Sequence, residues 1–166
     1  HAVRISYEML RKAIEISIKT GGISVVELAN GTDAVALNKL VEAKNPLAIG
    51  VAKRRLFKRA FSLNIDSGKG GRAAKFFDGK QVREELSDVF SSACGETGFV
   101  LCLPQVHSTP LSVKISIGGK KTDLSEISPL ARALEAENGE REFILACAEG
   151  KKAAAKKAAE KFFASF

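Results

Sequence analysis

Residues 82–103, VREELSDVFSSACGETGFVLCL, place a helical pattern directly before a strand pattern. The helical part carries an apolar stripe with a spacing of three or four residues, formed by Val82, Leu86, Val89 and Phe90. The short apolar run at 99–103 is followed by Pro104 and is typical of a buried strand. Helices and strands that follow one another in this way predict an α+β fold, in which helices pack on a mixed or antiparallel sheet.

The segments on either side contain further helices and strands. Hydrophobic spacing and turn residues predict helices at 6–20, 33–43, 129–137 and from 151 onward. Short β-branched or alternating runs predict strands at 23–29, 47–52, 61–65 and 142–148, and a hairpin that joins 113–117 to 120–124. We expect Asp33 to cap one helix and the pair Asp78 and Gln81 to cap another.

The chain is long enough to form one α+β unit over residues 1–166, because 166 residues with 45% hydrophobic side chains can bury a substantial core. Residues 36–61 and 129–163 both suggest a helix, a break, an apolar strand and a cation-rich stretch. An internal duplication would give two similar lobes, at 1–66 and 78–166, joined by a glycine-rich basic loop at 67–77. The alternative is that amphipathic segments resemble each other by composition.

The positive charge of the chain is concentrated in one segment. The formal net charge is +7, and residues 53–75 account for all of it. This basic segment carries, against the single acid Asp66, the cations Lys53, Arg54, Arg55, Lys58, Arg59, Lys69, Arg72 and Lys75. Because the rest of the chain has no net charge, this concentrated cationic segment predicts a binding surface for an anionic partner. A smaller surplus of lysines lies in 151–161, which we expect to be the solvated face of a docked terminal helix.

The end of the basic segment, IDSGKGGRAAKFF at 65–77, combines cations with glycines. Gly68, Gly70 and Gly71 can turn backbone N–H groups toward an anion, and Lys69, Arg72 and Lys75 would neutralise phosphates. The GKGG sequence resembles the GxxG loop of KH nucleic-acid-binding domains, which implies a grip on the backbone of four nucleotides. The alternative interpretation is a solvated linker.

These features predict a non-catalytic nucleic-acid-binding protein that contacts phosphates through residues 53–75. The chain has ten Phe, one Tyr and no Trp, so an extensive base-stacking platform is not expected. Duplex or structured DNA or RNA is therefore the expected partner, rather than free single strands. A protein-interaction or adaptor module that binds an acidic protein partner is the main alternative, because the same cations could meet an acidic surface.

A second resemblance concerns the latter part of the chain. Residues 113–163 resemble the later part of the HPr phosphocarrier family, with a strand, a Gly-Gly turn, a strand, a short helix, a strand and an Ala-rich helix. Upstream, PQVHSTP at 104–110 is similar to the phosphoacceptor loop of that family. The resemblance implies phosphotransfer on His107 as a further alternative function.

The remaining reactive residues indicate little chemistry. Three cysteines, Cys94, Cys102 and Cys147, lie in apolar segments without CxxC spacing, so we expect buried free thiols in a cytoplasmic protein. Two histidines provide no metal-ligand cluster, and we expect neither a metal nor another cofactor. A formal Cys/His pair between His107 and Cys94 or Cys102 would be needed for a thiol enzyme. No apolar run has the roughly 18 residues that span a bilayer.

Overall fold

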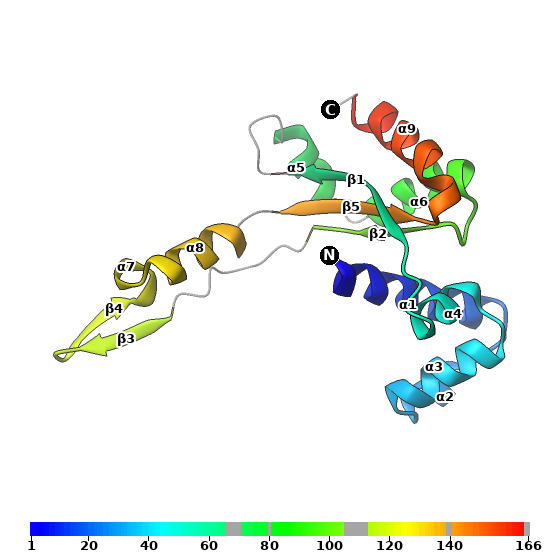
Figure 1. The fold of residues 1–166 in the computed structure, drawn as a ribbon, viewed down its shortest axis with the longest axis horizontal. Coiled ribbons are helices and arrows are strands. Elements are labelled where there is room, and N and C mark those ends of the chain that lie inside the picture. Colours follow the sequence, from blue (N-terminus) through cyan, green and yellow to red (C-terminus); the bar gives the residue numbers. More distant parts are fainter. Residues whose placement is uncertain (66–70, 80, 105–112, 139–140, 165–166) are drawn as a thin grey trace.

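A computed structural model of the chain describes residues 1–65, 71–79, 81–104, 113–138 and 141–164 (Figure 1). Its centre is an antiparallel sheet of three strands in the order β1-β5-β2. The strands are β1 (Lys58–Asn64), β2 (Phe99–Cys102) and β5 (Glu142–Cys147). The strands predicted at 61–65, 99–103 and 142–148 are therefore confirmed, as is the α+β fold class.

Helices cover both faces of this sheet, so β2 and β5 are buried on both sides. One face packs against α1 (Ala2–Lys19), α3 (Asp33–Glu42) and α4 (Pro46–Ala52) through Val100, Cys102, Ile144 and Ala146. The other face packs against α5 (Gly71–Phe77), α6 (Val82–Cys94) and α9 (Lys152–Phe163) through Phe99, Leu101, Phe143, Leu145 and Cys147. Alternate side chains thus build two cores from one sheet.

The predicted hairpin is confirmed and belongs to a separate part of the molecule. Strands β3 (Lys114–Ile117) and β4 (Lys120–Asp123) pair through Gly118 and Gly119, whose φ values of 57° and 79° suit a tight turn. The short α7 (Leu124–Ile127) and α8 (Pro129–Asn138) follow, and Figure 1 shows this group apart from the main sheet. We call residues 113–138 the arm.

Two predicted strands are helices in the structure. Residues 23–29 contain α2 (Val25–Ala29), which begins with a capping box in which Ser24 and Glu27 bond each other's backbone N–H. Residues 47–52 form α4, where the Asn45 carboxamide oxygen accepts hydrogen bonds from the N–H groups of Leu47 and Ala48. In both segments a helix cap outweighs the β preference of the valines and isoleucines.

The structure also corrects the predicted caps, and it does not confirm the duplication. The side chain of Thr32, rather than Asp33, caps α3. Gln81 occupies the N-cap of α6 without a side-chain cap bond, and Asp78 accepts from Arg141 at 3.2 Å. The duplication is not confirmed, because residues 47–52 form a helix whereas their counterparts in β5 form a strand.

Candidate nucleic-acid interface

The first part of the basic segment lies in the turn between α4 and β1. The N–H of Arg54 donates to the Val51 carbonyl at 3.0 Å, and the N–H of Arg55 donates to the Gly50 carbonyl at 2.8 Å. This is the Schellman pattern of a helix C-terminus, and it places Arg54 in the left-handed region at φ 53°. The turn directs consecutive cations to the surface immediately before the chain enters the sheet.

Four cations at this turn and at the start of β1 have exposed side chains. Within the described ranges, no ion pair forms at Lys53, Arg54, Arg55 or Lys58, and we call these residues the basic edge. Arg59 differs, since its guanidinium lies 3.8 Å from the carboxylate of Glu142. Leu56 and Phe57 are partly buried against the core of the α1 face and hold the turn in place. The basic edge therefore offers cations from an anchored backbone.

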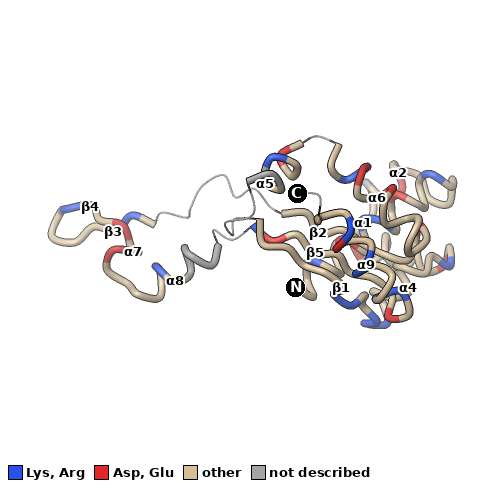
Figure 2. Tube along the Cα trace, turned by 90° about the horizontal axis from the view of Figure 1, so that it is seen from above, with Lys and Arg blue, Asp and Glu red and all other residues tan. Residues whose placement is uncertain are grey.

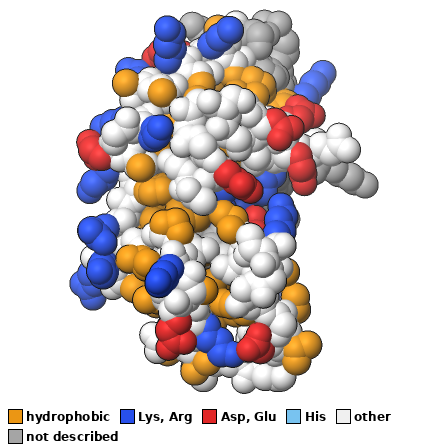
Figure 3. All heavy atoms as spheres, turned by 90° about the vertical axis from the view of Figure 1, so that its right-hand side faces the viewer, with side chains coloured by type: hydrophobic (Ala, Val, Ile, Leu, Met, Phe, Trp, Pro, Cys, Tyr) orange, Lys and Arg blue, Asp and Glu red, His pale blue; other side chains and the backbone are white. Residues whose placement is uncertain are grey.

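The basic edge meets the turn between β5 and α9. A hollow of about 430 Å³ is lined by residues 54–58 together with Ala148 and Glu149. Lys151 ends a 3-10 turn (Glu149–Lys151), and Lys152 is the first residue of α9. Figure 2 shows Lys and Arg positions gathered beside α4 and β1, and Figure 3 shows such side chains along one side of the molecule. Glu149 is the acidic member of this region.

The rest of the basic segment lies at the other end of β1. Lys75 is exposed on α5, and Gly71 and Arg72 begin that helix. Gly68, Lys69 and Gly70 lie outside the described residues. Because β1 has seven residues, its ends are roughly 20 Å apart. The structure therefore divides the cations predicted as one segment into two groups.

Helix α5 was not predicted, although its aromatic residues give a signal for it. Phe76 and Phe77 pack edge to face, with ring centroids 5.3 Å apart, and Phe77 contacts Phe143 of β5. Phe163 of α9 stacks on Phe61 of β1 at 5.6 Å. These contacts fix α5 and α9 on the sheet, and the lysines of α9 are exposed, as expected for a docked terminal helix.

The cysteines are buried free thiols, as predicted. Burial raises the pKa of Cys102 and of Cys147 to about 11, and it also raises the pKa of Cys94. A thiol with a raised pKa is a poor nucleophile at neutral pH. His107 lies outside the described residues, and among those described no group of three His, Cys, Asp or Glu side chains could hold a metal ion.

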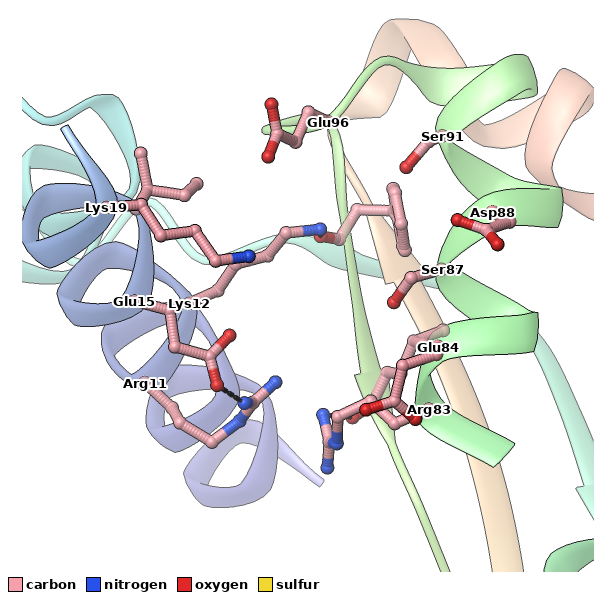
Figure 4. A pocket seen from close by; sticks show the side chains of 13 residues that line it. Arg11, Lys12, Glu15, Lys19, Arg83, Glu84, Ser87, Asp88, Ser91 and Glu96 are labelled. Carbon is pink, nitrogen blue, oxygen red and sulfur yellow. Dashed lines mark hydrogen bonds and ion pairs between the residues drawn. The ribbon is translucent and has the colours of Figure 1, made fainter. Parts of the chain in front are cut away.

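A second hollow was missed by the sequence reasoning. A cleft of about 610 Å³ opens between α1 and α6 beside β2, and charged side chains from both helices line it (Figure 4). The available signal was in α1, where Glu8 is buried beside Ile5 and Met9, and Lys12 follows one turn later and is partly buried. Polar residues at such positions are unusual unless they serve a purpose.

These features define an α+β module with a sheet covered on both faces and an exposed cationic edge. The family described as "HD associated region" matches residues 1–164, which is nearly the whole chain, and the chain belongs to that family. No curated protein and no solved structure matches the sequence. Each helix in the described part of the chain is too short or too polar to cross a membrane.

Proposed function

We propose that this chain is a non-catalytic accessory module that binds nucleic acid through the phosphate backbone at its basic edge. The observation that carries the proposal is the exposure of Lys53, Arg54, Arg55 and Lys58 at an anchored turn and the adjoining start of β1, with no ion pair to a carboxylate in the described part of the chain. Unpaired cations on a fixed backbone can replace condensed counterions on a nucleic acid, which is the main source of sequence-independent affinity.

The arrangement of the cations supports a structured partner. The turn presents them close together, and Lys151 of the adjacent 3-10 turn and Lys152 of α9 extend the positive surface. Aromatic side chains of the neighbouring elements, such as Phe61 and Phe163, pack against each other instead of facing solvent as a stacking platform. A duplex or folded RNA, which presents regularly spaced phosphates, fits this surface better than a single strand whose bases need stacking.

The family description suggests the setting in which this module works. It associates the region with HD, so we propose that the chain accompanies an HD domain and supplies binding rather than chemistry. A nucleic-acid surface in an accessory region would hold the partner near the rest of the protein. The same description favours the second candidate, in which the basic edge binds an acidic protein surface, in the HD partner or elsewhere.

Fluorescence anisotropy with labelled duplex DNA, structured RNA and single-stranded DNA tests the proposal. The variant Arg54→Glu/Arg55→Glu/Lys58→Glu should abolish binding at about 50 mM salt. The matched control Lys114→Glu/Lys120→Glu/Lys121→Glu changes the net charge equally on the exposed hairpin of the arm and should retain most of the affinity.

Circular dichroism establishes that both variants are folded. Binding of the natural chain should fall steeply between about 50 and 200 mM salt if several phosphates are contacted. Absence of binding to all three nucleic acids at the lowest salt would refute the proposal and leave the acidic protein partner as the better candidate. Equal loss in both variants would show that only net charge matters and would remove the basic edge as the site.

A further inference from the structure

The cleft between α1 and α6 lies along the free edge of β2. Strand β2 pairs with β5 on one side, and in the described part of the sheet no strand pairs with its other side. The N–H of Ala148 donates to the Gly98 carbonyl, so Gly98, Val100 and Cys102 bond toward β5. The backbone groups of Phe99 and Leu101 consequently point outward into the cleft.

Two cationic side chains donate hydrogen bonds to the outward carbonyl groups of this edge. The Lys12 ammonium donates to the Phe99 carbonyl at 3.1 Å, and the Arg83 guanidinium donates to the Leu101 carbonyl at 3.3 Å. The N–H of Leu101 lies between these two carbonyls along the strand and has no hydrogen-bond partner among the described residues. An amide donor thus stands between two positive side chains.

The orientation of Arg83 is fixed by a buried carboxylate. Glu8 is only 8% exposed and accepts from Arg83 at 2.9 and 3.2 Å, one bond to each carboxylate oxygen. Glu8 also accepts from Arg11 at 2.7 Å, and Arg11 pairs in turn with Glu15. These bonds join α1 to α6 and hold the guanidinium of Arg83 at the strand edge.

Lys12 and Lys19 are the cations of the cleft that form no ion pair within the described residues, and Lys12 is the more buried of the two. The Lys12 ammonium lies 3.5 Å from the centre of the Phe99 ring and, within the described residues, makes no ion pair. The pKa of Lys12 is lowered to about 8, chiefly by burial and also by the nearby charge of Arg11, although Glu96, Glu15 and Cys94 act in the opposite direction. A partly buried ammonium without an anion is costly, and a bound anion would remove that cost.

We propose that the cleft binds a small ligand through an oxyanion group, a phosphate or a carboxylate, placed at the N–H of Leu101 between Lys12 and Arg83. Figure 4 shows Lys12 and Lys19 extending from α1 toward the strand, with Ser87 and Ser91 on α6 across the cleft. Hydroxyl groups and an amide N–H complete the donors that an oxyanion needs.

The acidic residues of the cleft limit the size of this ligand. Glu15, Glu84, Asp88 and Glu96 are exposed residues that line the same cleft. Their negative charges would repel a long polyanion, so the ligand is a small molecule and not the nucleic acid proposed for the basic edge. The inference is therefore independent of the proposed function, and the two sites can be tested separately.

The test is a titration of the isotopically labelled chain with sodium phosphate and with sodium acetate, followed by backbone amide NMR at constant ionic strength with chloride as the reference. We expect saturable shifts centred on the amides of Phe99 and Leu101 with at least one of the two oxyanions. Lys12→Met keeps the aliphatic packing on Phe99 but removes the charge, and should weaken binding about tenfold or more. Lys157→Met, on the exposed face of α9, is the matched control and should bind as the natural chain does.

Two results would overturn the proposal. One is the absence of saturable shifts at Phe99 and Leu101 with both oxyanions. The other is equal affinity in the Lys12→Met and natural chains, because the site then does not use the uncompensated ammonium. Since Lys12→Met removes a desolvated charge, loss of folding is not expected, and the amide spectrum itself reports whether the variant is folded.

Discussion

Arg54→Gly should separate binding from folding at the basic edge. Arg54 occupies a left-handed position at φ 53°, which costs a residue other than glycine roughly 1–2 kcal/mol. Glycine avoids this strain but adds about 0.5–1 kcal/mol of backbone entropy to the unfolded chain. The difference predicts that Arg54→Gly stabilises the protein by about 0.5–1 kcal/mol, although it removes a cation from the proposed interface.

Lys44→Gly is a closely matched control. Lys44 has φ 57° at the end of α3, where its N–H donates to Val41 and the N–H of Asn45 donates to Leu40, so it occupies the same kind of Schellman turn. The two variants lose the same charge and relieve the same strain. Their positions lie beyond opposite ends of the seven-residue α4, which is itself roughly 10 Å long.

The two variants should have equal stabilities but different affinities. Urea unfolding should give both a similar rise in the free energy of unfolding. In duplex anisotropy at 150 mM salt, Arg54→Gly should weaken binding about fivefold and reduce the slope of log K against log salt by about 1, as for one lost phosphate contact. Lys44→Gly should leave the slope unchanged.

Two different experimental results would contradict this prediction. Equal slopes in both variants would show that Arg54 makes no phosphate contact and that the protein binds through its overall charge. A fall in stability in both variants would instead show that the left-handed turns carry no strain that glycine can relieve. Neither result can be attributed to net charge, which is the same in the two chains.

Three further predictions concern the core and the cleft. Asn45→Ala should cost about 2–4 kcal/mol in urea unfolding, because Asn45 caps α4 and its buried amide also donates to Ala13 and Ser17 at 3.1 Å; a loss below about 1 kcal/mol would contradict this role. Lys12 has a folded pKa of about 8 against 10.5 unfolded, so the unfolded chain binds more protons there and the Lys12 contribution to stability should rise between these values; the buried thiols, whose pKa values are raised above 9.0, act in the opposite direction above pH 9, so the measurement is the difference between the natural and Lys12→Met chains, which should change with pH in this window. Iodoacetamide should modify Cys94, Cys102 and Cys147 rapidly only after unfolding, and rapid labelling of the native chain at pH 7.5 would contradict their burial.

The sequence predicted the sheet better than the helices of the first half. The strands β2 and β5 and the hairpin of the arm carry patterns that depend on their own residues, and all were predicted. The segments at α2 and α4 are β-branched and short, and what makes them helical is a cap. For α4 that cap is Asn45, whose amide is held by α1, so the decisive contact is remote in sequence.

The candidate sites, like the helices, could be predicted only where the signal is local in the sequence. The cations at 53–59 could be identified as a surface feature because charge density is a local property of the sequence. The separation of these cations from Lys75 could not be predicted, because it depends on the extended strand β1, which runs between the two groups. A local count of charges therefore identifies candidate contact residues but not the shape of the surface that they form.

The cleft depends on three segments that the chain brings together from far apart. Lys12, Arg83 and Leu101 meet only because α1 and α6 cover opposite faces of β2 and leave its edge between them. The sequence does hold one clue, since Glu8 and Lys12 interrupt the apolar stripe of Ile5, Met9 and Ala13. A helix that packs on a sheet excludes charges from its buried side unless they are satisfied there. Glu8 is satisfied by Arg11 and Arg83, whereas within the described residues Lys12 contacts a carbonyl and a ring but forms no ion pair, and this makes Lys12 the most informative residue of the cleft.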